Sequence, residues 1–163
     1  HMVAREQNLI GPVMEQPQYN MFTRDRVEDE YKDLYEIGLG TTIWSPLLSG
    51  LLTGKYNDEM PSGTRFDIAG MEWLKERVLT EENLTKVRAM TAFAEGELGM
   101  SMTHLALAWC LKNPQVSTVI LGASRISQLE SNLQALDHVD KLTPGVMEKI
   151  DEVLANKPKR DWF

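Results

Sequence analysis

The chain has 163 residues, of which 42% are hydrophobic and 25% charged, so it is long and apolar enough to bury one globular core. Its formal net charge of −7 argues against nucleic acid as a partner, because phosphate backbones are bound by clustered basic side chains. No apolar run approaches the ~20 residues that cross a bilayer, and the start lacks a signal-peptide pattern, so we expect no membrane insertion and a cytoplasmic location.

The cysteine content and the N-terminus add two expectations. The single cysteine, Cys110, cannot form a disulfide within the chain and offers no thiolate cluster, so we expect a reducing compartment and no metal site. His1-Met2 resembles a cloning scar, and the residues from Val3 onward have the pattern of the middle of a helix. We therefore expect the chain to be a piece of a longer protein.

The first part of the chain predicts two strands with a helix between them. Residues 11–16 form a short apolar run between Gly-Pro and Pro17, which is typical of a buried strand. Apolar residues at helical spacing predict an amphipathic helix from Asp25 to a stop at Gly38. The β-branched and aromatic run 40–44 predicts a second strand.

The middle of the chain predicts a long loop and then helices. Glycines and prolines break up the sequence after the second strand, and only residues 72–78 look helical within this loop. Thr80 is the expected N-cap of a helix that stops at Gly99, and a buried helix is expected from Ser101 or Met102 to just before Pro114.

The last part of the chain predicts one more strand and two more helices. The continuous β-branched run 117–121 is typical of a strand covered on both faces. A helix is expected over 127–135, and Thr143-Pro144 provides the cap and first residue of a closing helix. Strands that alternate with helices pair in parallel, so the predicted class is α/β. Three strands are too few for a closed eight-stranded α/β barrel, which typically needs ~250 residues.

Three segments at the strand ends carry a family resemblance: Pro12 to Gln16, Thr42 to Gly50, and Val119 to Ser124. In order and spacing they resemble strands six, seven and eight of an aldo-keto reductase. Gly54-Lys55-Tyr56, Trp73-Leu74-Lys75 and the LALAWCL run 105–111 are similar to the voltage-gated potassium channel β-subunit branch. The resemblance implies a partial (β/α)8 TIM barrel in which residues 1–163 form the C-terminal half of an NADP-dependent oxidoreductase domain.

The resemblance also implies an NADPH site at the C-terminal face of the barrel. Gln16 would hydrogen-bond the nicotinamide carboxamide and Trp44 would stack on its ring. The pyrophosphate path would be lined by Ser45, Pro46, Leu47, Ser49 and Gly50. Without the family, Gln16 would be interpreted as a surface residue, Trp44 as core, and the segment after it as a plain turn.

The remaining implied contacts lie on the long loop and after the third strand. Lys55 and Arg65 would close over the pyrophosphate and the adenosine ribose. The 2′-phosphate would lie at a helix start, against Gly122, Ser124, Arg125 and Gln128. Asn132 would contact adenine. Two departures from the family pattern are Ser131, where an acidic residue is usual, and Gly63, where the channel β-subunits carry an aromatic residue.

No catalytic residue is expected in this chain. The family reduces carbonyls with a tyrosine, lysine, aspartate and histidine from the first half of the barrel. The tyrosines here lie in other segments, and His104 and His138 lie in or beside helices, where a structural role is more common.

Three hypotheses for the function follow. The first is a portion of a reductase whose parent acts on a small carbonyl substrate. The second is a regulatory module that partners a potassium channel α subunit. The third is a truncated product with no independent role. A half barrel also exposes sheet edges, so we expect it to bind the missing N-terminal half or to form a homo-oligomer by edge pairing.

Overall fold

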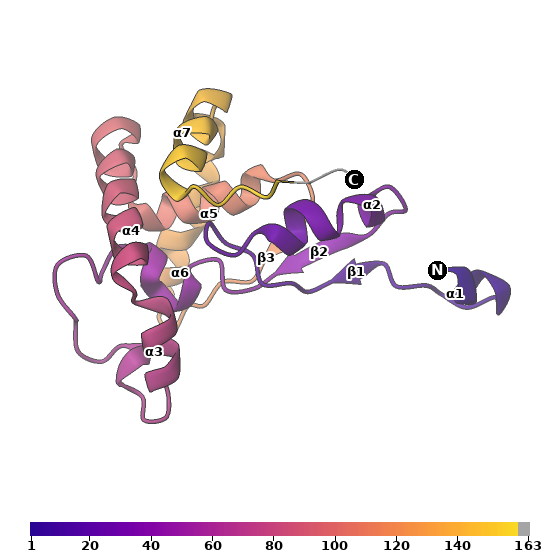
Figure 1. Ribbon diagram of the computed structural model, residues 1–163, viewed down its shortest axis with the longest axis horizontal. Coiled ribbons are helices and arrows are strands. Elements are labelled where there is room, and N and C mark those ends of the chain that lie inside the picture. Colours follow the sequence, from indigo (N-terminus) through magenta and orange to yellow (C-terminus); the bar gives the residue numbers. More distant parts are fainter. Residues whose placement is uncertain (160–163) are drawn as a thin grey trace.

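The computed structural model describes residues 1–159 and shows a parallel three-stranded sheet with helices around it (Figure 1). The strands are β1 (Met14–Glu15), β2 (Gly40–Ile43) and β3 (Val116–Val119), in the order β1-β2-β3. Met14 pairs with Gly40 on one edge of β2, and Ile43 pairs with Val119 on the other. The α/β class and the parallel pairing predicted from the sequence are confirmed.

The helical elements follow the predicted order. The α-helices are α1 (Met2–Glu6), α2 (Lys32–Tyr35), α3 (Glu72–Val78), α4 (Glu81–Phe93), α5 (Met102–Lys112), α6 (Ile126–Leu133) and α7 (Pro144–Leu154). Two π-helical segments, Arg26–Glu30 and Ala94–Leu98, and three 3-10 helices, Leu48–Thr53, Arg65–Asp67 and Gln134–Lys141, complete the described elements. Within residues 1–159 no helix is both long enough and apolar enough to cross a membrane.

Two helix starts have the N-caps that the sequence predicted, Thr80 and Thr143, and the start of α5 is capped by Ser101. The side chains of Thr80, Ser101 and Thr143 accept hydrogen bonds from backbone N–H groups in the first turns of α4, α5 and α7. Gly99 adopts a left-handed φ of 61°, which ends the helical run of α4. The sequence therefore sets the ends of these helices through local chemistry.

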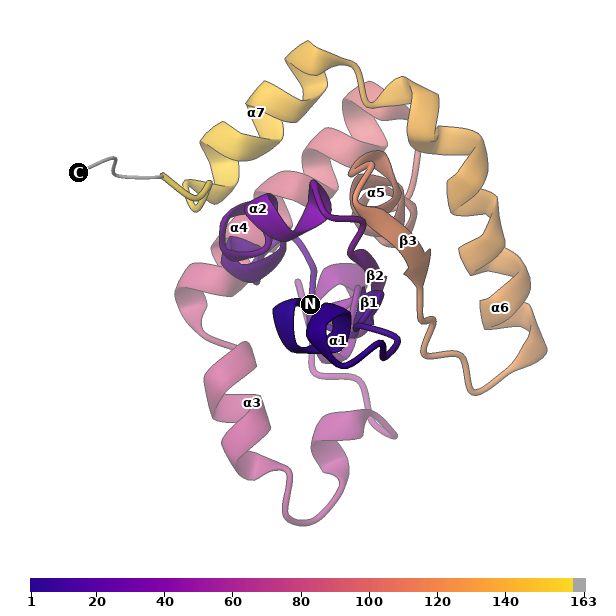
Figure 2. The same cartoon turned by 90° about the vertical axis from the view of Figure 1, so that its right-hand side faces the viewer.

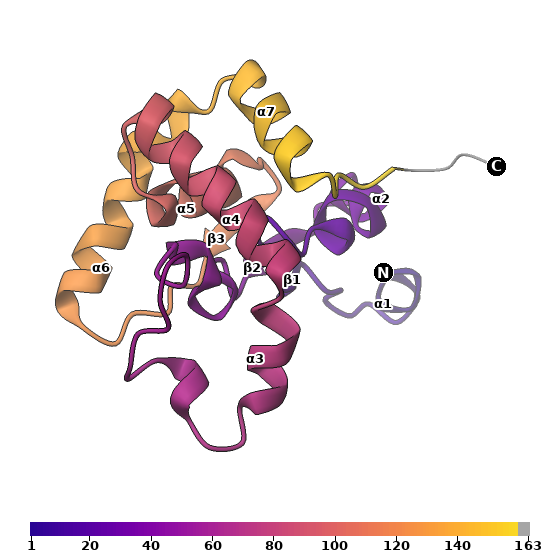
Figure 3. The ribbon, with the colours of Figure 1, turned by 60° about the vertical axis from the view of Figure 1, so that its left-hand side comes forward.

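The core lies between the sheet and one group of helices. Figures 1 and 3 show α4, α5 and α7 gathered on one side of the sheet, whereas α1 projects from the N-terminal end. Residues 105–110 of α5 are all buried, including Trp109 at 1% exposure, which confirms the predicted buried helix. α5 packs against β3 and against the 3-10 helix Gln134–Lys141.

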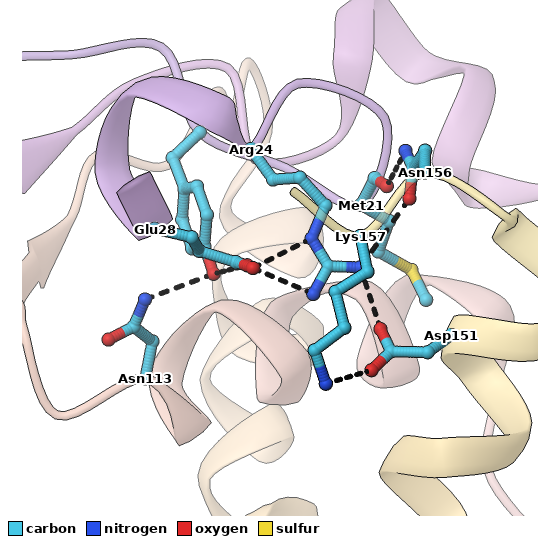
Figure 4. Close-up of polar contacts among 8 residues, drawn as sticks. Met21, Arg24, Glu28, Asn113, Asp151, Asn156 and Lys157 are labelled. Atoms are coloured by element: carbon cyan, nitrogen blue, oxygen red, sulfur yellow. Dashed lines mark hydrogen bonds and ion pairs between the residues drawn. The ribbon is translucent and has the colours of Figure 1, made fainter. Parts of the chain in front are cut away.

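A buried arginine joins the first helical segment to the C-terminal helix. Arg24 is only 4% exposed, and its guanidinium forms ion pairs with Glu28 at 2.8 Å and with Asp151 at 2.7 Å (Figure 4). The same group lies 5.0 Å from the centre of the Trp109 ring, which stacks on Tyr19. We call Arg24, Glu28, Asp151, Trp109 and Tyr19 the Arg24 cluster. It ties segments more than one hundred residues apart into one core.

Two sequence predictions about strand burial are wrong. The strand expected over 11–16 forms pairs only at Met14 and Glu15, and both are exposed. The strand expected over 117–121 begins at Val116, and Ser117 and Thr118 are exposed rather than covered. Both are the outer strands of the described sheet, so each has a neighbour on one edge only.

Two helix predictions need correction as well. The segment 25–38 is helical but divides into the π-helix Arg26–Glu30 and the short α2. The helix expected over 127–135 is α6, which continues as the 3-10 helix Gln134–Lys141. Periodicity alone does not distinguish α, π and 3-10 winding, since all three place apolar residues on one face over a short segment.

Candidate functional site

A cavity of about 1370 Å³ lies at the carboxyl ends of the strands. Its walls come from the turn after β2, from the lobe 53–83 that contains α3, and from the segment between β3 and α6. Figure 2 shows α3 on one side of the strands and α6 on the other. Ligands bind at this end of a parallel α/β sheet because several βα loops converge there.

The cavity brings together almost all of the residues selected from the sequence. From the turn after β2 and from the lobe, Trp44, Ser45, Pro46, Leu47, Ser49, Gly50, Lys55 and Arg65 line it. From the segment after β3, Gly122, Ser124, Arg125, Gln128 and Asn132 line it. Residues from three separate parts of the sequence thus line the same cavity, as expected for a binding site.

Gln16 is the exception. Its side chain is exposed and is not among the residues that line the cavity, so its contact with nicotinamide stays a prediction. Gln18 lines the cavity instead and forms a bridge with Trp44 through the backbone. The chain reaches the cavity two residues later than the sequence suggested, because β1 ends at Glu15 and an extended segment follows it.

The turn after β2 is held in an uncommon backbone conformation. Ser45, Leu48 and Ser49 have φ values of 59°, 44° and 56°, and Gly50 has a φ of 95°. Left-handed residues in succession turn backbone groups toward one side and favour an anion-binding concavity. Buried Asn20 supports the turn, since its side-chain amide donates to the Ser45 carbonyl oxygen at 3.0 Å.

Trp44 is well placed for a flat ligand. It is a large aromatic residue, yet 44% of it is exposed where it lines the cavity. A tryptophan at the end of a central strand is usually covered by the core. An exposed indole face beside a turn of small residues instead offers an apolar stacking surface.

The charge distribution in the cavity differs from that of the chain as a whole. The chain carries a net charge of −7, but the described residues that line the cavity include Lys55, Arg65, Arg77 and Arg125 and no aspartate or glutamate. Within residues 1–159, none of these four cations forms an ion pair with a carboxylate. Unpaired cations that converge on one cavity favour an anionic ligand.

Arg77 is a cavity residue that the sequence analysis missed. It lies in the last turn of α3, one helical turn after Trp73, which is 58% exposed and lines the same cavity. The spacing of four residues places both side chains on one face of α3. That spacing is visible in the sequence, but the position of α3 against the cavity is not.

The start of α6 presents polar groups to the cavity. The backbone N–H and the hydroxyl of Ser124 both donate to the side-chain oxygen of Gln128, at 2.9 and 3.1 Å. Arg125 occupies the N-cap position of α6 in an extended conformation, makes no side-chain capping hydrogen bond, and is exposed. The free N–H groups and dipole of a helix start favour a phosphate, and Arg125 adds charge at this point. Asn132, at 8% exposure, faces the cavity from the next turns.

The histidines have a structural environment. The rings of His104 and His138 stack with centres 5.2 Å apart, and His104 Nε2 lies 2.9 Å from the Ser131 carbonyl oxygen. Burial, followed by the charge of Lys141, lowers the pKa of His138. Neither histidine lines the cavity; the stacked pair joins α5 to the 3-10 helix Gln134–Lys141, and His104 also contacts α6 through Ser131. Among the residues that the structure describes, no group of three or more His, Cys, Asp or Glu side chains could hold a metal.

Comparison with known proteins agrees with this geometry. The model of the aldo/keto reductase family matches residues 2–155. The chain belongs to the aldo/keto reductase family. The aldo/keto reductase family implies a (β/α)8 barrel, and the described structure is α/β with a parallel three-stranded sheet and a cavity at the strand ends.

Several curated members of the family are similar over nearly the whole chain. A probable voltage-gated potassium channel subunit beta from Arabidopsis thaliana is 48% identical over 155 residues, which cover 94% of this chain and 47% of that protein. A protein of the same name from Oryza sativa subsp. japonica is 47% identical over 160 residues, which cover 97% of this chain and 48% of that one. A putative voltage-gated potassium channel subunit beta from Schizosaccharomyces pombe is 48% identical over 162 residues and is covered to 46%. The chain spans about half the length of these relatives.

Proposed function

We propose that this chain is the NADPH-binding C-terminal portion of an aldo-keto reductase that reduces small aldehydes or ketones by hydride transfer. One observation carries the proposal: a chain with a net charge of −7 has a cavity whose described lining includes four cations and no carboxylate. NADPH carries a pyrophosphate and a 2′-phosphate, so it is an anion of the required kind. A cavity of about 1370 Å³ is also large enough for a dinucleotide.

The residues of the cavity fit the parts of NADPH in order. Trp44 would stack on the nicotinamide, and the turn up to Gly50, with Pro46 and Leu47 as apolar wall, would follow the pyrophosphate. Lys55 and Arg65 would neutralise the pyrophosphate from the lobe. Ser124, Arg125 and Gln128 would hold the 2′-phosphate at the start of α6, with Gly122 leaving room and Asn132 at the adenine. When bound, the nicotinamide would supply the hydride.

The proton donor belongs to another part of the parent in this proposal. Tyr19 is buried in the Arg24 cluster, where burial, followed by the charge of Glu28, raises its pKa. Tyr31, Tyr35 and Tyr56 do not line the cavity. We therefore propose that the described sheet corresponds to strands six to eight of the barrel and that the catalytic tetrad comes from the N-terminal half.

The sheet edges and α6 provide a surface for that half. Ile10 is 97% exposed and Val13 66% exposed beside β1, while Ile126 is 77% exposed on α6. Large apolar side chains at two outer edges favour burial against another chain. We propose that the missing half covers them in the parent and that a second copy covers them in the isolated chain. Size-exclusion chromatography tests this: we expect a concentration-dependent oligomer, and a monomer at all concentrations would contradict it.

A titration with NADPH tests the proposed function. Binding should quench tryptophan fluorescence saturably, and Trp44→Phe should remove most of the quenching while circular dichroism shows an unchanged fold. The other tryptophans make this variant a necessary control, because the sequence contains four. A folded chain that shows no saturable binding at millimolar NADPH would contradict the proposal.

A second candidate function is a regulatory module that binds a potassium channel α subunit. The names of the three relatives favour it, since each is called a voltage-gated potassium channel subunit beta. Co-purification of the full-length parent with a channel α subunit would support this function. Turnover of simple aldehydes by the parent would support the reductase function, and the two results are compatible.

A further inference from the structure

Asn132 has a buried side chain whose amide group is free. The residue is only 8% exposed and lines the cavity, yet its amide forms no hydrogen bond among residues 1–159. A buried amide normally has hydrogen-bond partners, because leaving it without any destabilises a fold. A free amide in the wall of a binding cavity is suited to a ligand, and its orientation decides what it can bind.

Asn132 lies in the last turn of α6, where the helix changes its winding. α6 ends at Leu133 and continues as the 3-10 helix Gln134–Lys141. At this junction the backbone N–H of Gln134 donates to the carbonyl oxygens of both Ser131 and Asn132. The carbonyl groups of a last helical turn lack regular partners within the helix, so other groups must hold them. The turn that carries Asn132 therefore needs support from outside α6.

His104 of α5 supplies this support. Its Nε2 atom lies 2.9 Å from the Ser131 carbonyl oxygen and 3.4 Å from the Ser131 hydroxyl oxygen. A carbonyl oxygen only accepts hydrogen bonds, so Nε2 must carry a proton and donate it. The peptide group that contains the Ser131 carbonyl also contains the N–H of Asn132. The hydrogen bond from His104 thus holds the backbone of Asn132 directly.

The His104 ring is itself held in place. His138, on the 3-10 helix that follows α6, stacks on it with ring centres 5.2 Å apart and planes inclined by 28°. Burial, followed by the charge of Lys141, lowers the pKa of His138, so this ring is neutral at pH 7 and covers His104 without charge repulsion. α5 fixes the other side, since the residues from Leu105 to Cys110 are buried. The support of Asn132 is therefore anchored in the core.

We propose that His104 is a positioning residue for Asn132, which fixes the last turn of α6 so that the Asn132 amide faces the adenine of NADPH. This inference rests on the proposed NADPH function and adds to it a residue outside the cavity. An asparagine amide pairs with adenine through two hydrogen bonds, accepting from the 6-amino group and donating to N7. Both bonds require one orientation of the amide. A turn that is not held should therefore lose selectivity for adenine before it loses the phosphate contacts.

The test compares NADPH with its hypoxanthine analogue, in which an oxygen replaces the 6-amino group. The analogue keeps the pyrophosphate and the 2′-phosphate, so the ratio of the two affinities, measured by calorimetric titration, reports on adenine recognition. The 163-residue chain should prefer NADPH about 10-fold, and Asn132→Ala should reduce this preference to about twofold or less. His104→Leu should reduce it to about threefold, because the amide is still present but no longer held.

His104→Gln is the conservative variant. A glutamine Nε2 group can donate to the Ser131 carbonyl oxygen as the histidine does, so the preference for NADPH should stay within about twofold of the wild type. His104→Asn takes the place of His104→Leu if the latter does not fold. Its shorter side chain cannot reach Ser131, and it should show the same reduced preference.

Lys141→Met is the matched control. It removes a hydrogen bond of similar length, 3.1 Å from Lys141 Nζ to the Leu98 carbonyl oxygen, without touching Ser131. Thermal unfolding should show similar small losses of melting temperature for His104→Leu and Lys141→Met, whereas only His104→Leu should change the preference for NADPH. A purely structural role of His104 would lower the melting temperature and leave the preference unchanged.

The outcomes separate the two proposals. If the folded wild-type chain binds neither dinucleotide, both the proposed function and this inference fail. If it binds both with equal affinity, or if His104→Leu keeps the wild-type preference, only the role of His104 is overturned. Failure of His104→Gln to keep the preference, or its loss in Lys141→Met as well, would also overturn that role, since the effect would then be a general loss of packing.

Discussion

The Arg24 cluster and the cavity differ in whether their positively charged side chains have carboxylate partners. In the cluster, one buried arginine has two carboxylate partners and an aromatic ring, so its charge is fully compensated within the chain. In the cavity, four described cations face a shared space without a carboxylate partner among residues 1–159. A compensated charge stabilises the fold, whereas an uncompensated one is available to a ligand. The comparison predicts that substitutions in one region change stability and in the other change binding.

The largest effect is expected from Arg24→Met. Removal of the guanidinium leaves Glu28 partly buried without its ion-pair partner and leaves Asp151 with only the exposed Lys157, so the free energy of unfolding should fall by about 3–5 kcal/mol. Urea denaturation followed by circular dichroism measures this. Arg26→Met is the control, because the Arg26–Glu30 pair is 59% exposed on both sides and should change stability little. Equal stability of the two variants would show that the cluster does not hold the core.

The next largest effect is expected on binding. Lys55→Ala and Arg65→Ala should each weaken NADPH binding about 10-fold and leave the midpoint of unfolding nearly unchanged, because neither side chain has an ion pair to lose among the described residues. Calorimetric titration gives the affinity, and a thermal melt gives the stability. A large loss of stability with unchanged affinity would reverse the assignment of the two regions.

Arg77→Ala should have a similar but smaller effect. Arg77 lines the cavity from α3, and its positive charge should add a few-fold to NADPH affinity. Lys75 lies on the same helix but does not line the cavity, so Lys75→Ala serves as the control. If both variants bind NADPH like the wild type, Arg77 is only a surface residue.

A pH effect is expected in the Arg24 cluster. Burial by itself raises the pKa of Asp151, but hydrogen bonds from Lys157 and Arg24 outweigh it and hold the pKa below its usual value. A carboxyl whose pKa is lower in the folded chain stabilises it above the unfolded pKa of about 3.9 and loses this contribution as the pH falls through the folded value. Asp151→Asn should therefore flatten the acid limb of a stability profile. An unchanged profile would exclude Asp151 as a source of acid sensitivity.

Sequence and structure agree where local chemistry decides. α3 begins and ends at the predicted residues, and the caps at Thr80 and Thr143 form because one side chain reaches its own first turn. All of the residues selected for the cofactor site except Gln16 line the cavity, but they were selected through the family resemblance, since each looks ordinary by itself. Helix ends can therefore be predicted from a few neighbouring residues, whereas the residues of the cavity cannot.

The differences arise where contacts are long-range. Exposure of Ser117 and Thr118 depends on β3 being an outer strand, which periodicity does not reveal. Arg77 reaches the cavity only because the lobe folds back toward the turn after β2. The single local feature of the sequence that pointed to Arg77 was its position one helical turn after a tryptophan, Trp73.

The central claim is that cations with no carboxylate partner among residues 1–159 make the cavity a site for an anionic dinucleotide. The most direct test is calorimetric titration of the wild-type chain with NADPH at low and at high salt. The account predicts saturable binding at one site per chain that weakens as the salt concentration rises, because the contacts are between exposed charges and phosphates. Absence of binding by a folded chain at either salt concentration, or affinity that does not change with salt, would contradict it.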